Sequence, residues 1–530
     1  MHIDRRTLLR TAGLSLLGGA ALTACASAPA ARPAFVTPTG AQVSAAERAR
    51  RPGALRDVRL TSAATQADLG GLSVRTWAYD DAIPGRAIRV QAGEVIRAHL
   101  TNRLPQDTSI HWHGLALRND ADGVPGLTQQ PIAAGTEFAY QFTAARPGTY
   151  WFHPHSGTQL DRGLYAPLIV EDPHEPLGYD EEWIVVLDDW LDGITGTPEE
   201  VLTELSRGMG MNHGTGTTHD MPDMPGMDHS MDGMDGMTPG ASATPSGGRG
   251  GHMLMGATSL LLGGDAGDVR YPYFLLNGRI PASPQTFRAR PGTRLRLRII
   301  NAGGDTAFRV ALAGHRMTVT HTDGMPVRHA ETDALLIGMG ERYDVLVTLG
   351  DGVFPLVALA EGKNALARGL IRTSPSAAAP GAGLRPGELD GELAGYAGLR
   401  PAEEARLPAK NPDRTIKLEL TGGMMAYDWA INGKKYDPAA ISAAISPVRS
   451  GERVRLSFVN RTMMWHPMHL HGHTFALAEG GIRKDTVIVL PNSRLQVDFD
   501  ADNPGLWMIH CHNVYHAESG MMTLLGYLQP

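Results

Sequence analysis

The residues of this chain best suited to chemistry are four His-x-His pairs: His111/His113, His153/His155, His469/His471 and His510/His512. On a β-strand, side chains two residues apart point to the same face and lie roughly 7 Å apart. One pair could therefore present two imidazoles to two neighbouring metal ions. A single histidine is more simply a surface or core residue, so the placement of the pairs decides whether they indicate a metal.

Two pairs follow matching segments. Gly148 precedes His153 by five residues, and Gly505 precedes His510 by five residues. The other two pairs come shortly after Asn102 and Asn460, each of which ends a copy of a repeated Gly-to-Asn segment. The middle of the chain has the same skeleton without a His pair. Eight histidines divided equally between two end modules indicate one polynuclear metal site where those modules meet, with the middle module as a spacer.

Cys511 lies between His510 and His512, so on a strand its thiolate would point away from both imidazoles. Together with His466, His516 and Met521 it offers two imidazoles, a thiolate and a weak axial thioether, the ligand set of a blue electron-transfer copper. This arrangement predicts one-electron oxidation at a single metal that feeds multi-electron chemistry at the neighbouring cluster.

The elements that position these residues are predicted to be strands. Three segments run nine residues from Gly to Asn, namely 93–102, 292–301 and 451–460. Apolar and polar residues alternate within them, which is the period of a strand with one buried face. Further short strands are expected at 137–142, 294–300 and 495–499, between turns rich in Gly, Pro and Asn. The pattern predicts an all-β fold of three Greek-key β-sandwiches or barrels.

The length of 530 residues suggests about three domains at roughly 150 residues each. The predicted parts are a signal and N-terminal tether at 1–54, domain 1 at 55–178, domain 2 at 179–375 with a Met-rich insertion at about 205–255, a linker at 376–409, and domain 3 at 410–530. The net charge of −7 gives no electrostatic reason to expect a nucleic-acid partner.

The N-terminus has the pattern of an export signal. Arg5-Arg6 precede an apolar run from Leu8 to Leu22, which is too short to span a bilayer as a helix. The pair of arginines resembles a twin-arginine signal, and Leu22-Thr23-Ala24-Cys25 resembles a lipobox. We expect export to the cell envelope, either as a periplasmic protein or with a lipid anchor at Cys25 on the outer face of the membrane. Ordinary cleavage near Ala26 to Ala28 is the alternative. No transmembrane span is expected in the mature protein.

Cys25 and Cys511 are the two cysteines of the chain. If Cys25 belongs to the signal, Cys511 has no partner for an internal disulfide. A lone thiol in an exported protein favours metal ligation.

These motifs closely resemble those of the multicopper oxidases over nearly the whole mature length. The segments are His-Trp-His-Gly, His-Pro-His, His-Pro-Met-His-Leu-His and His-Cys-His followed by His516 and Met521. The nearest resemblance is to bacterial three-domain members of the copper-resistance and laccase type, including mycobacterial members. The resemblance implies cupredoxin-like domains, four copper ions and reduction of O₂ to water. It also implies substrates such as phenols, aromatic amines or low-valent metal ions.

Carried over by motif, the resemblance assigns each ligand to a type of copper. Type 1 copper takes His466, Cys511, His516 and Met521, and type 2 copper takes His111 and His469. The binuclear type 3 site takes His113, His153, His155, His471, His510 and His512. His473 lies beyond the motif and is interpreted as a supporting or structural residue.

Two carboxylates are candidates for proton delivery. Asp122 comes nine residues after His113, where the family places a carboxylate near the O₂ site, although an Asp in a surface turn would have the same spacing. The family's copper-efflux oxidase has Glu directly after the last type 1 His, whereas this chain has Ala517 there and Glu518 one residue further on. That departure puts the usual carboxylate relay in doubt.

A methionine-rich stretch without hydrophobic period interrupts domain 2 and favours disorder. Its methionines are Met209, Met211, Met221, Met224, Met227, Met231, Met234 and Met237. Thioethers prefer Cu(I), so the stretch suits collection of copper as a substrate, and Met464 near the type 1 motif is a further candidate. A low-complexity spacer is the alternative. Thr462 replaces an Asp of the copper-efflux oxidase, so that enzyme's substrate-copper site does not transfer directly.

The sequence therefore predicts a multicopper oxidase that couples oxidation of Cu(I), phenolic compounds or both to four-electron reduction of O₂, with a role in copper tolerance. A general laccase that acts on phenols and aromatic amines is the first alternative, and a non-catalytic copper-binding protein is the second. Nitrite reduction does not require four His-x-His pairs.

Overall fold

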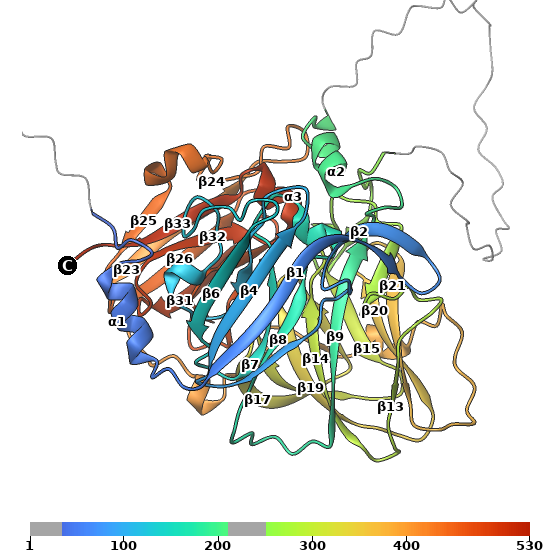
Figure 1. Ribbon diagram of the computed structural model, residues 1–530. Coiled ribbons are helices and arrows are strands. Elements are labelled where there is room, and N and C mark those ends of the chain that lie inside the picture. The colour runs from blue at the N-terminus through green and yellow to red at the C-terminus, as the bar shows by residue number, and fades with distance from the viewer. Residues whose placement is uncertain (1–33, 210–250) are drawn as a thin grey trace, which may run out of the picture. The chain divides into compact units, whose positions relative to one another are not determined.

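The computed structural model describes residues 34–209 and 251–530, in which strands are the main secondary structure (Figure 1). Phe35–Pro530 form one folded unit. The strands of this unit form three pairs of sheets, which we call the N-terminal, middle and C-terminal sandwiches in chain order. The predicted all-β fold is confirmed.

The N-terminal sandwich pairs two four-stranded sheets around a core that both sheets line. Its first sheet has the order β2 (Ser73–Tyr79), β1 (Leu55–Asp68), β4 (Val95–Arg103), β6 (Glu137–Thr143). Its second sheet has the order β3 (Ile88–Gln91), β8 (Ala166–Glu171), β7 (Gly148–His153), β5 (His111–His113).

The middle sandwich pairs two six-stranded sheets. The first has the order β12 (Tyr273–Leu276), β9 (Glu181–Trp190), β14 (Arg294–Asn301), β19 (Arg342–Thr348), β16 (Met317–Thr322), β17 (Met325–Thr332). The second has the order β13 (Thr286–Arg288), β21 (Ala365–Arg372), β20 (Val353–Ala360), β15 (Phe308–Leu312), β18 (Ala334–Ile337), β22 (Leu393–Ala394). β22 lies within the segment predicted as a linker, and it pairs with β18. A small hairpin, β10 (Thr258–Ser259) and β11 (Gly264–Asp265), precedes β12.

The C-terminal sandwich pairs a six-stranded and a five-stranded sheet. The first has the order β24 (Ala430–Ile431), β23 (Arg414–Thr421), β26 (Arg453–Asn460), β31 (Arg494–Asp500), β28 (Phe475–Leu477), β29 (Arg483–Lys484). The second has the order β25 (Ile445–Val448), β33 (Met522–Tyr527), β32 (Leu506–Cys511), β27 (His466–Leu470), β30 (Thr486–Val489).

The three Gly-to-Asn segments form equivalent strands. β4, β14 and β26 each pair in parallel with the first long strand of their own sandwich and antiparallel with a later one. The side chain of the terminal Asn is buried in all three copies, and its amide donates to a backbone carbonyl of the following loop. The Asn therefore fixes the loop that leads toward the next strand, which in the end sandwiches carries a His pair.

Three α-helices occur among the described residues: α1 (Ala41–Ala49), α2 (Pro198–Leu205) and α3 (Val514–Ser519). α2 begins with a capping box in which Thr197 and Glu200 satisfy each other's backbone amides. α3 is capped by Asn513, whose side chain accepts from the amides of Tyr515 and His516. Within the described part of the chain, no helix is long and apolar enough to cross a membrane.

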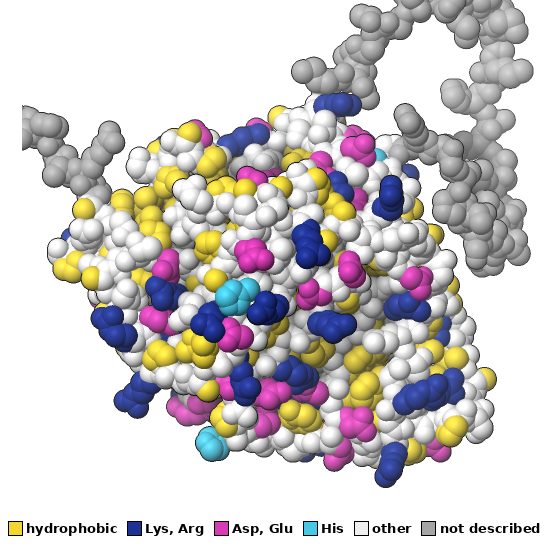
Figure 2. Space-filling view, in the orientation of Figure 1, with side chains coloured by type: hydrophobic (Ala, Val, Ile, Leu, Met, Phe, Trp, Pro, Cys, Tyr) yellow, Lys and Arg dark blue, Asp and Glu magenta, His cyan; other side chains and the backbone are white. Residues whose placement is uncertain are grey.

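The sandwiches pack together through buried side chains. One apolar cluster joins the middle and C-terminal sandwiches and reaches α1 through Val43. On the face drawn in Figure 2, acidic and basic side chains are interspersed and do not gather into a field of one sign. The packing brings the His-bearing sheets of the two end sandwiches into contact.

Candidate metal centre

Each end sandwich places its own two His pairs on adjacent strands. β5 pairs with β7, which sets His111 opposite His153, and β27 pairs with β32, which sets His469 opposite His510. Each pairing concentrates four imidazoles at one end of a sheet. The equivalent positions follow from the repeated skeleton that the sequence predicted.

The two patches of imidazoles meet across the interface between the end sandwiches. The His111 ring stacks on His471 at 3.7 Å between centroids, and the His113 ring stacks on His469 at 3.8 Å. Three triads have ligand atoms that all lie within 4.8 Å of one another: His111, His113 and His469; His113, His153 and His512; His155, His471 and His510. All eight histidines therefore form one cluster.

The ring nitrogens of this cluster divide into two kinds. The outer nitrogens of His111, His153 and His510 donate to the carbonyls of Asp122, Pro154 and Cys511, at 2.9, 2.9 and 2.8 Å. One ring nitrogen of His111, His113, His153 and His469 and both ring nitrogens of His512 are buried and find no hydrogen-bond partner in the part of the chain that is described. A buried polar atom without a partner is costly, so these nitrogens fit a site that holds metal ions.

Burial also favours the protonation state that metal binding requires. It lowers the pKa of His113, His153, His469, His471, His510 and His512 below the ordinary histidine value. Imidazole binds a metal ion through a nitrogen that carries no proton. Burial therefore favours, in these six imidazoles, the neutral form that can bind a metal ion.

A second cluster lies on the other side of Cys511. The Cys511 Sγ is 3.7 Å from His466 Nδ1 and 3.6 Å from His516 Nδ1, and the two nitrogens are 3.1 Å apart. All three side chains are fully buried. Met521 is also buried, and its carbonyl accepts from the Cys511 amide at 3.1 Å. These four residues suit a type 1 copper, because soft sulfur and imidazole ligands favour that metal.

The fold separates the two clusters by single residues. His510 and Cys511 end β32, and His512 follows, so neighbouring side chains serve different clusters. α3 then turns the chain back, and its Asn513 cap is held at 2.6 Å by Asp305 of the middle sandwich. This turn brings His516 to the same small site as Cys511.

The two predicted proton carriers lie in different surroundings. Asp122 is fully buried, and its Oδ2 accepts from His471 Nδ1 at 3.0 Å while its carbonyl accepts from His111. Glu518 lines a cavity of about 590 Å³ together with His155, Thr158 and Met522. Burial raises the pKa of Glu518 to about 7. Asp122 is therefore not a surface turn residue, and Glu518 lies beside an opening to the histidine cluster.

Three residues of the site were missed by sequence reasoning. Asp485 accepts from His113 Nε2 at 3.1 Å, and its carbonyl accepts from His469 Nδ1 at 2.9 Å. Arg342 of β19 bonds both oxygens of Asp485, at 2.7 and 2.6 Å. Asp268 accepts from His516 Nε2 at 2.9 Å. Thr462 has the corresponding contact with the other imidazole, at 2.9 Å from His466 Nε2. Arg342 and Asp268 belong to the middle sandwich, so that sandwich is more than a spacer.

Two of the methionine candidates lie among the described residues. Met209 is exposed just after α2, whereas Met464 is buried in the core. Met211, Met221, Met224, Met227, Met231, Met234 and Met237 lie outside the described residues. His473 Nδ1 donates to the His471 carbonyl at 3.0 Å, and its Nε2 lies 2.6 Å from the Tyr527 hydroxyl.

Three β-sandwiches, a shared histidine cluster and a Cys–His site one residue away define a copper-dependent electron-transfer oxidase. Multicopper oxidase family profiles match residues 61–175, 237–376 and 409–527. The chain belongs to the multicopper oxidase family. It is an oxidoreductase whose cofactors are type 1, type 2 and type 3 coppers, and members of the family reduce O₂.

Relatives match over almost the whole chain. The multicopper oxidase MmcO of Mycobacterium tuberculosis is 47% identical over 534 residues, which cover 99% of this chain and 98% of the relative. A copper resistance protein A homolog of Pseudomonas syringae pv. tomato is 30% identical. The match covers 87% of this chain and 90% of that relative.

Among solved structures, Fet3p, a multicopper oxidase that functions in iron import, has a TM-score of 0.71 at 23% identity and covers 89% of this chain and 90% of its own. The laccase of Botrytis aclada has a TM-score of 0.70 at 25% identity. The match covers 89% of this chain and 88% of the laccase chain. These likenesses confirm the predicted cupredoxin-like domains.

Proposed function

We propose that this chain oxidises Cu(I), and small phenolic compounds as secondary substrates, and passes the electrons to O₂, which is reduced to water in the service of copper tolerance. The observation that carries the proposal is the placement of Cys511 in one cluster and of its neighbours His510 and His512 in the other. Because Cys511 is bonded through the backbone to His510 and His512, the chain itself connects the site that accepts single electrons to the site that reduces O₂.

The proposed ligands follow the triads. His466, Cys511, His516 and Met521 would hold type 1 copper, and His111 and His469 would hold type 2 copper. His113, His153 and His512 would hold one type 3 copper, and His155, His471 and His510 would hold the other. When bound, the coppers would supply reversible one-electron transfer at the first site and multi-electron reduction of O₂ at the second.

The surrounding residues orient the ligands and control access. Thr462 and Asp268 fix the outer nitrogens of His466 and His516, which leaves both Nδ1 atoms directed at Cys511. Asp122 and Asp485 do the same for four imidazoles of the cluster. The cavity beside His155 gives small molecules access, and the Glu518 carboxyl, with a pKa of about 7, can release and regain a proton at neutral pH.

Copper tolerance is supported by the relatives named copper resistance protein A and by the methionine-rich stretch of this sequence. The second candidate function is a general laccase, which the similarity to fungal laccases favours. A copper-binding protein without catalysis is disfavoured, because storage does not need a thiolate that links two sites.

The experiment that tests the proposal measures O₂ uptake by the copper-loaded protein with Cu(I) and with a phenol. Two variants are compared with the wild type: a deletion of residues 209–237, and a chain of unchanged length with the eight methionines replaced by leucine. We expect both variants to lose most Cu(I) turnover and to keep phenol turnover. Unchanged Cu(I) turnover in both would favour the general laccase.

We also propose that the chain is exported by the twin-arginine route and anchored by lipid at Cys25, as the N-terminal motifs suggest. Mass spectrometry of the mature N-terminus tests this, and Cys25→Ser should release the protein from membranes. We further propose the domain boundaries 55–178, 179–375 and 410–530. The starts of β1 at Leu55, β9 at Glu181 and β23 at Arg414 support them, although β22 of the middle sandwich lies beyond residue 375.

A further inference from the structure

A cavity of about 290 Å³ lies where α1 and all three sandwiches meet, and its lining differs from that of the opening beside His155. Its lining includes Ala46 and Ala49 of α1, Gly114 and Arg146 of the N-terminal sandwich, Met325 of the middle sandwich, and His473, Arg483 and Asp502 of the C-terminal sandwich. Nothing in the proposed copper chemistry uses this cavity.

The cavity is rich in positive charge. Arg50, Arg146 and Arg483 line it, and Asp502 is the acidic residue among the lining side chains. Arg50 is already paired, since it bonds Glu47 at 2.9 Å and the Asn503 side chain at 2.8 Å. Asp502 makes no ion pair with either of the other two arginines in the described structure. Two guanidinium groups therefore face the cavity without a carboxylate partner.

Arg483 shows most clearly that an acceptor is missing. Its Nη2 donates to the Thr474 carbonyl at 2.9 Å and to the Thr474 hydroxyl. Its Nε is buried and has no acceptor among the described residues. The backbone of Arg483 is held in place by Thr322 of β16, which bonds its carbonyl at 3.1 Å. The Arg483 guanidinium is therefore held in a fixed position in the wall of the cavity, where its charge can attract an anion.

The neighbouring groups do not supply the missing charge. His473 already uses both ring nitrogens, with the His471 carbonyl and the Tyr527 hydroxyl. Burial and the neighbouring Arg146 lower the pKa of Arg483 to about 10, which still leaves the guanidinium charged at pH 7. Asp502 and Asp500 act in the opposite direction on the pKa of Arg483, but the lining still holds more arginines than carboxylates.

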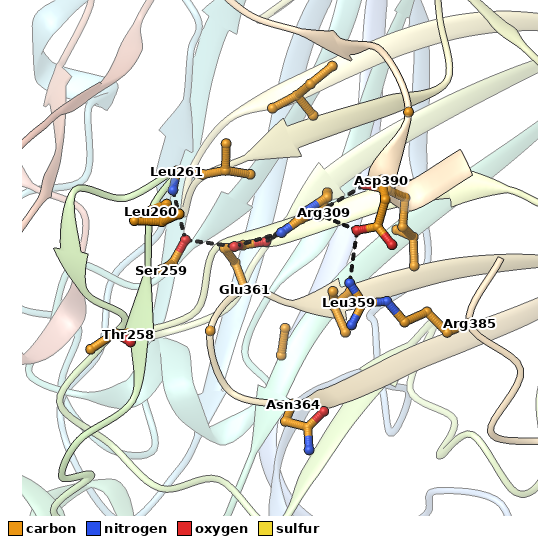
Figure 3. A pocket seen from close by; sticks show the side chains of 15 residues that line it. Thr258, Ser259, Leu260, Leu261, Arg309, Leu359, Glu361, Asn364, Arg385 and Asp390 are labelled. Atoms are coloured by element: carbon orange, nitrogen blue, oxygen red, sulfur yellow. Dashed lines mark hydrogen bonds and ion pairs between the residues drawn. The ribbon is translucent and has the colours of Figure 1, made fainter. Parts of the chain in front are cut away.

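Another cavity of this protein provides a contrast. Figure 3 shows a cavity of about 550 Å³ in which Arg309 also faces inward. There Arg309 bonds Glu361 at 2.8 and 2.9 Å and Asp390 at 3.2 Å, and Glu361 also accepts from Ser259 at 2.6 Å. In that cavity carboxylates bond the arginine directly, whereas in the cavity beside Arg483 the described structure has no ion pair between a carboxylate and Arg146 or Arg483.

We propose that the cavity between Arg146 and Arg483 binds a small inorganic oxyanion such as phosphate or sulfate. The planar guanidinium fork matches the oxygens of such an anion, and the volume leaves room for a tetrahedral oxyanion with bound water. The exposed Arg146 closes over the ligand from the N-terminal sandwich, and Arg483 holds it from the C-terminal sandwich.

An anion at this position would tie together the segments that build the histidine cluster. Gly114 lines the cavity directly after His113, and a Cβ at Gly114 would lie 2.3 Å from Arg342 Nη2 and 2.7 Å from Asp485. Gly114 therefore lies between the cavity and the Arg342–Asp485 ion pair that supports His113. Binding should stabilise the junction of the sandwiches, because a ligand that binds only the folded state raises its stability.

The test is a titration of the copper-loaded full-length protein with inorganic phosphate, in a zwitterionic buffer at constant ionic strength. Isothermal calorimetry should give one site per chain, and the melting temperature should rise with phosphate concentration. Arg146→Gln and Arg483→Gln should each weaken binding at least tenfold. Arg385→Gln, which changes an exposed arginine at the cavity of Figure 3, is the matched control and should bind as the wild type does.

Several results would overturn the proposal. Wild-type binding by Arg146→Gln would do so, and this variant keeps the test decisive even if Arg483→Gln fails to fold, since the Arg146 side chain is exposed. An equal rise in melting temperature with chloride at the same ionic strength would show general screening and no oxyanion site. Failure of the oxidase proposal would leave this result unaffected, because calorimetry does not depend on turnover.

Discussion

Arg342 donates two hydrogen bonds to Asp485, from Nη1 at 2.7 Å and from Nη2 at 2.6 Å, and both side chains are fully buried. The same arginine donates through Nε to the Thr149 carbonyl at 3.1 Å. One side chain of the middle sandwich therefore contacts a strand of the N-terminal sandwich and an Asp of the C-terminal sandwich, and this Asp bonds both His113 and His469. Burial alone would raise the pKa of Asp485, but the Arg342 guanidinium holds it well below the ordinary value.

Replacement of Arg342 by Met should therefore damage the histidine cluster from a distance. The change leaves the Asp485 carboxylate buried without its cation, and breaking such a pair costs about 3–5 kcal/mol. We expect copper analysis and electron paramagnetic resonance to show loss of type 2 and type 3 copper, while the blue absorption of type 1 copper remains. Arg342→Lys is the control, and it should retain part of the copper. Full copper content in Arg342→Met would contradict the positioning role.

The sequence indicated the ligand motifs because the residues of each single motif lie close together in the chain, and the repeat suggested that the motifs of the two end modules meet. A strand fixes the direction of His510, Cys511 and His512, and the repeated Gly-to-Asn segment shows which strands correspond. Arg342 and Asp485 are 143 residues apart, and no spacing rule connects them. Asp268 reaches His516 across 248 residues for the same reason. Contacts of this kind depend on how separate sandwiches pack, which periodicity within one strand does not record.

The middle sandwich is the clearest case of a contribution to the site that the sequence pattern does not indicate. Its lack of His pairs led to the expectation of a spacer. Gly340 of that sandwich instead approaches the cluster so closely that a Cβ there would lie 2.9 Å from the His512 ring and 3.1 Å from the His113 ring. Its backbone φ is +84°, which also favours glycine. A glycine and an arginine carry no metal-binding signal, so only the folded structure shows their part in the site.

Cys511→Ser should abolish both the blue colour and turnover while the protein remains folded. The thiolate is the expected chromophore, and it is the start of the covalent path to His510 and His512. Visible absorption and O₂ uptake measure the two effects, and far-ultraviolet circular dichroism checks the fold. Substrate-driven O₂ uptake by the serine variant would show that electrons reach the histidine cluster by another route.

His153→Ala should separate the two half-reactions in the opposite way. The His153 Nε2 is buried without a partner in the described residues and belongs to a triad with His113 and His512. Its loss removes a ligand from the histidine cluster but leaves His466, Cys511 and His516 untouched. In stopped-flow measurements, we expect substrate to bleach the blue colour at the wild-type rate and O₂ to restore it at least a hundredfold more slowly. Normal reoxidation would remove His153 from the proposed ligand set.

Asp161 should make stability depend on pH. Its Oδ2 lies 2.5 Å from the Tyr515 hydroxyl and 3.1 Å from the Tyr271 hydroxyl, in full burial. Burial is the main cause that raises the pKa of Asp161 well above the ordinary value. The neighbouring charge of Asp189 is the second cause. The folded state therefore binds a proton more tightly than the unfolded state, whose Asp has a pKa of about 3.9. This contribution to stability is complete below that value and is lost as the pH rises toward the folded pKa.

Asp161→Asn removes this dependence, because an amide does not titrate. Relative to the wild type, the copper-loaded variant should gain stability as the pH rises from 5 to 7, with a slope of up to about 1.4 kcal/mol per pH unit for one proton. Melting temperatures of both proteins across this range measure the difference, and the titrating histidines cancel because both proteins share them. Asp57→Asn, at an exposed ion pair with Arg97, is the control and should show a much smaller slope. A wild-type slope that persists in Asp161→Asn would show that another buried group is responsible.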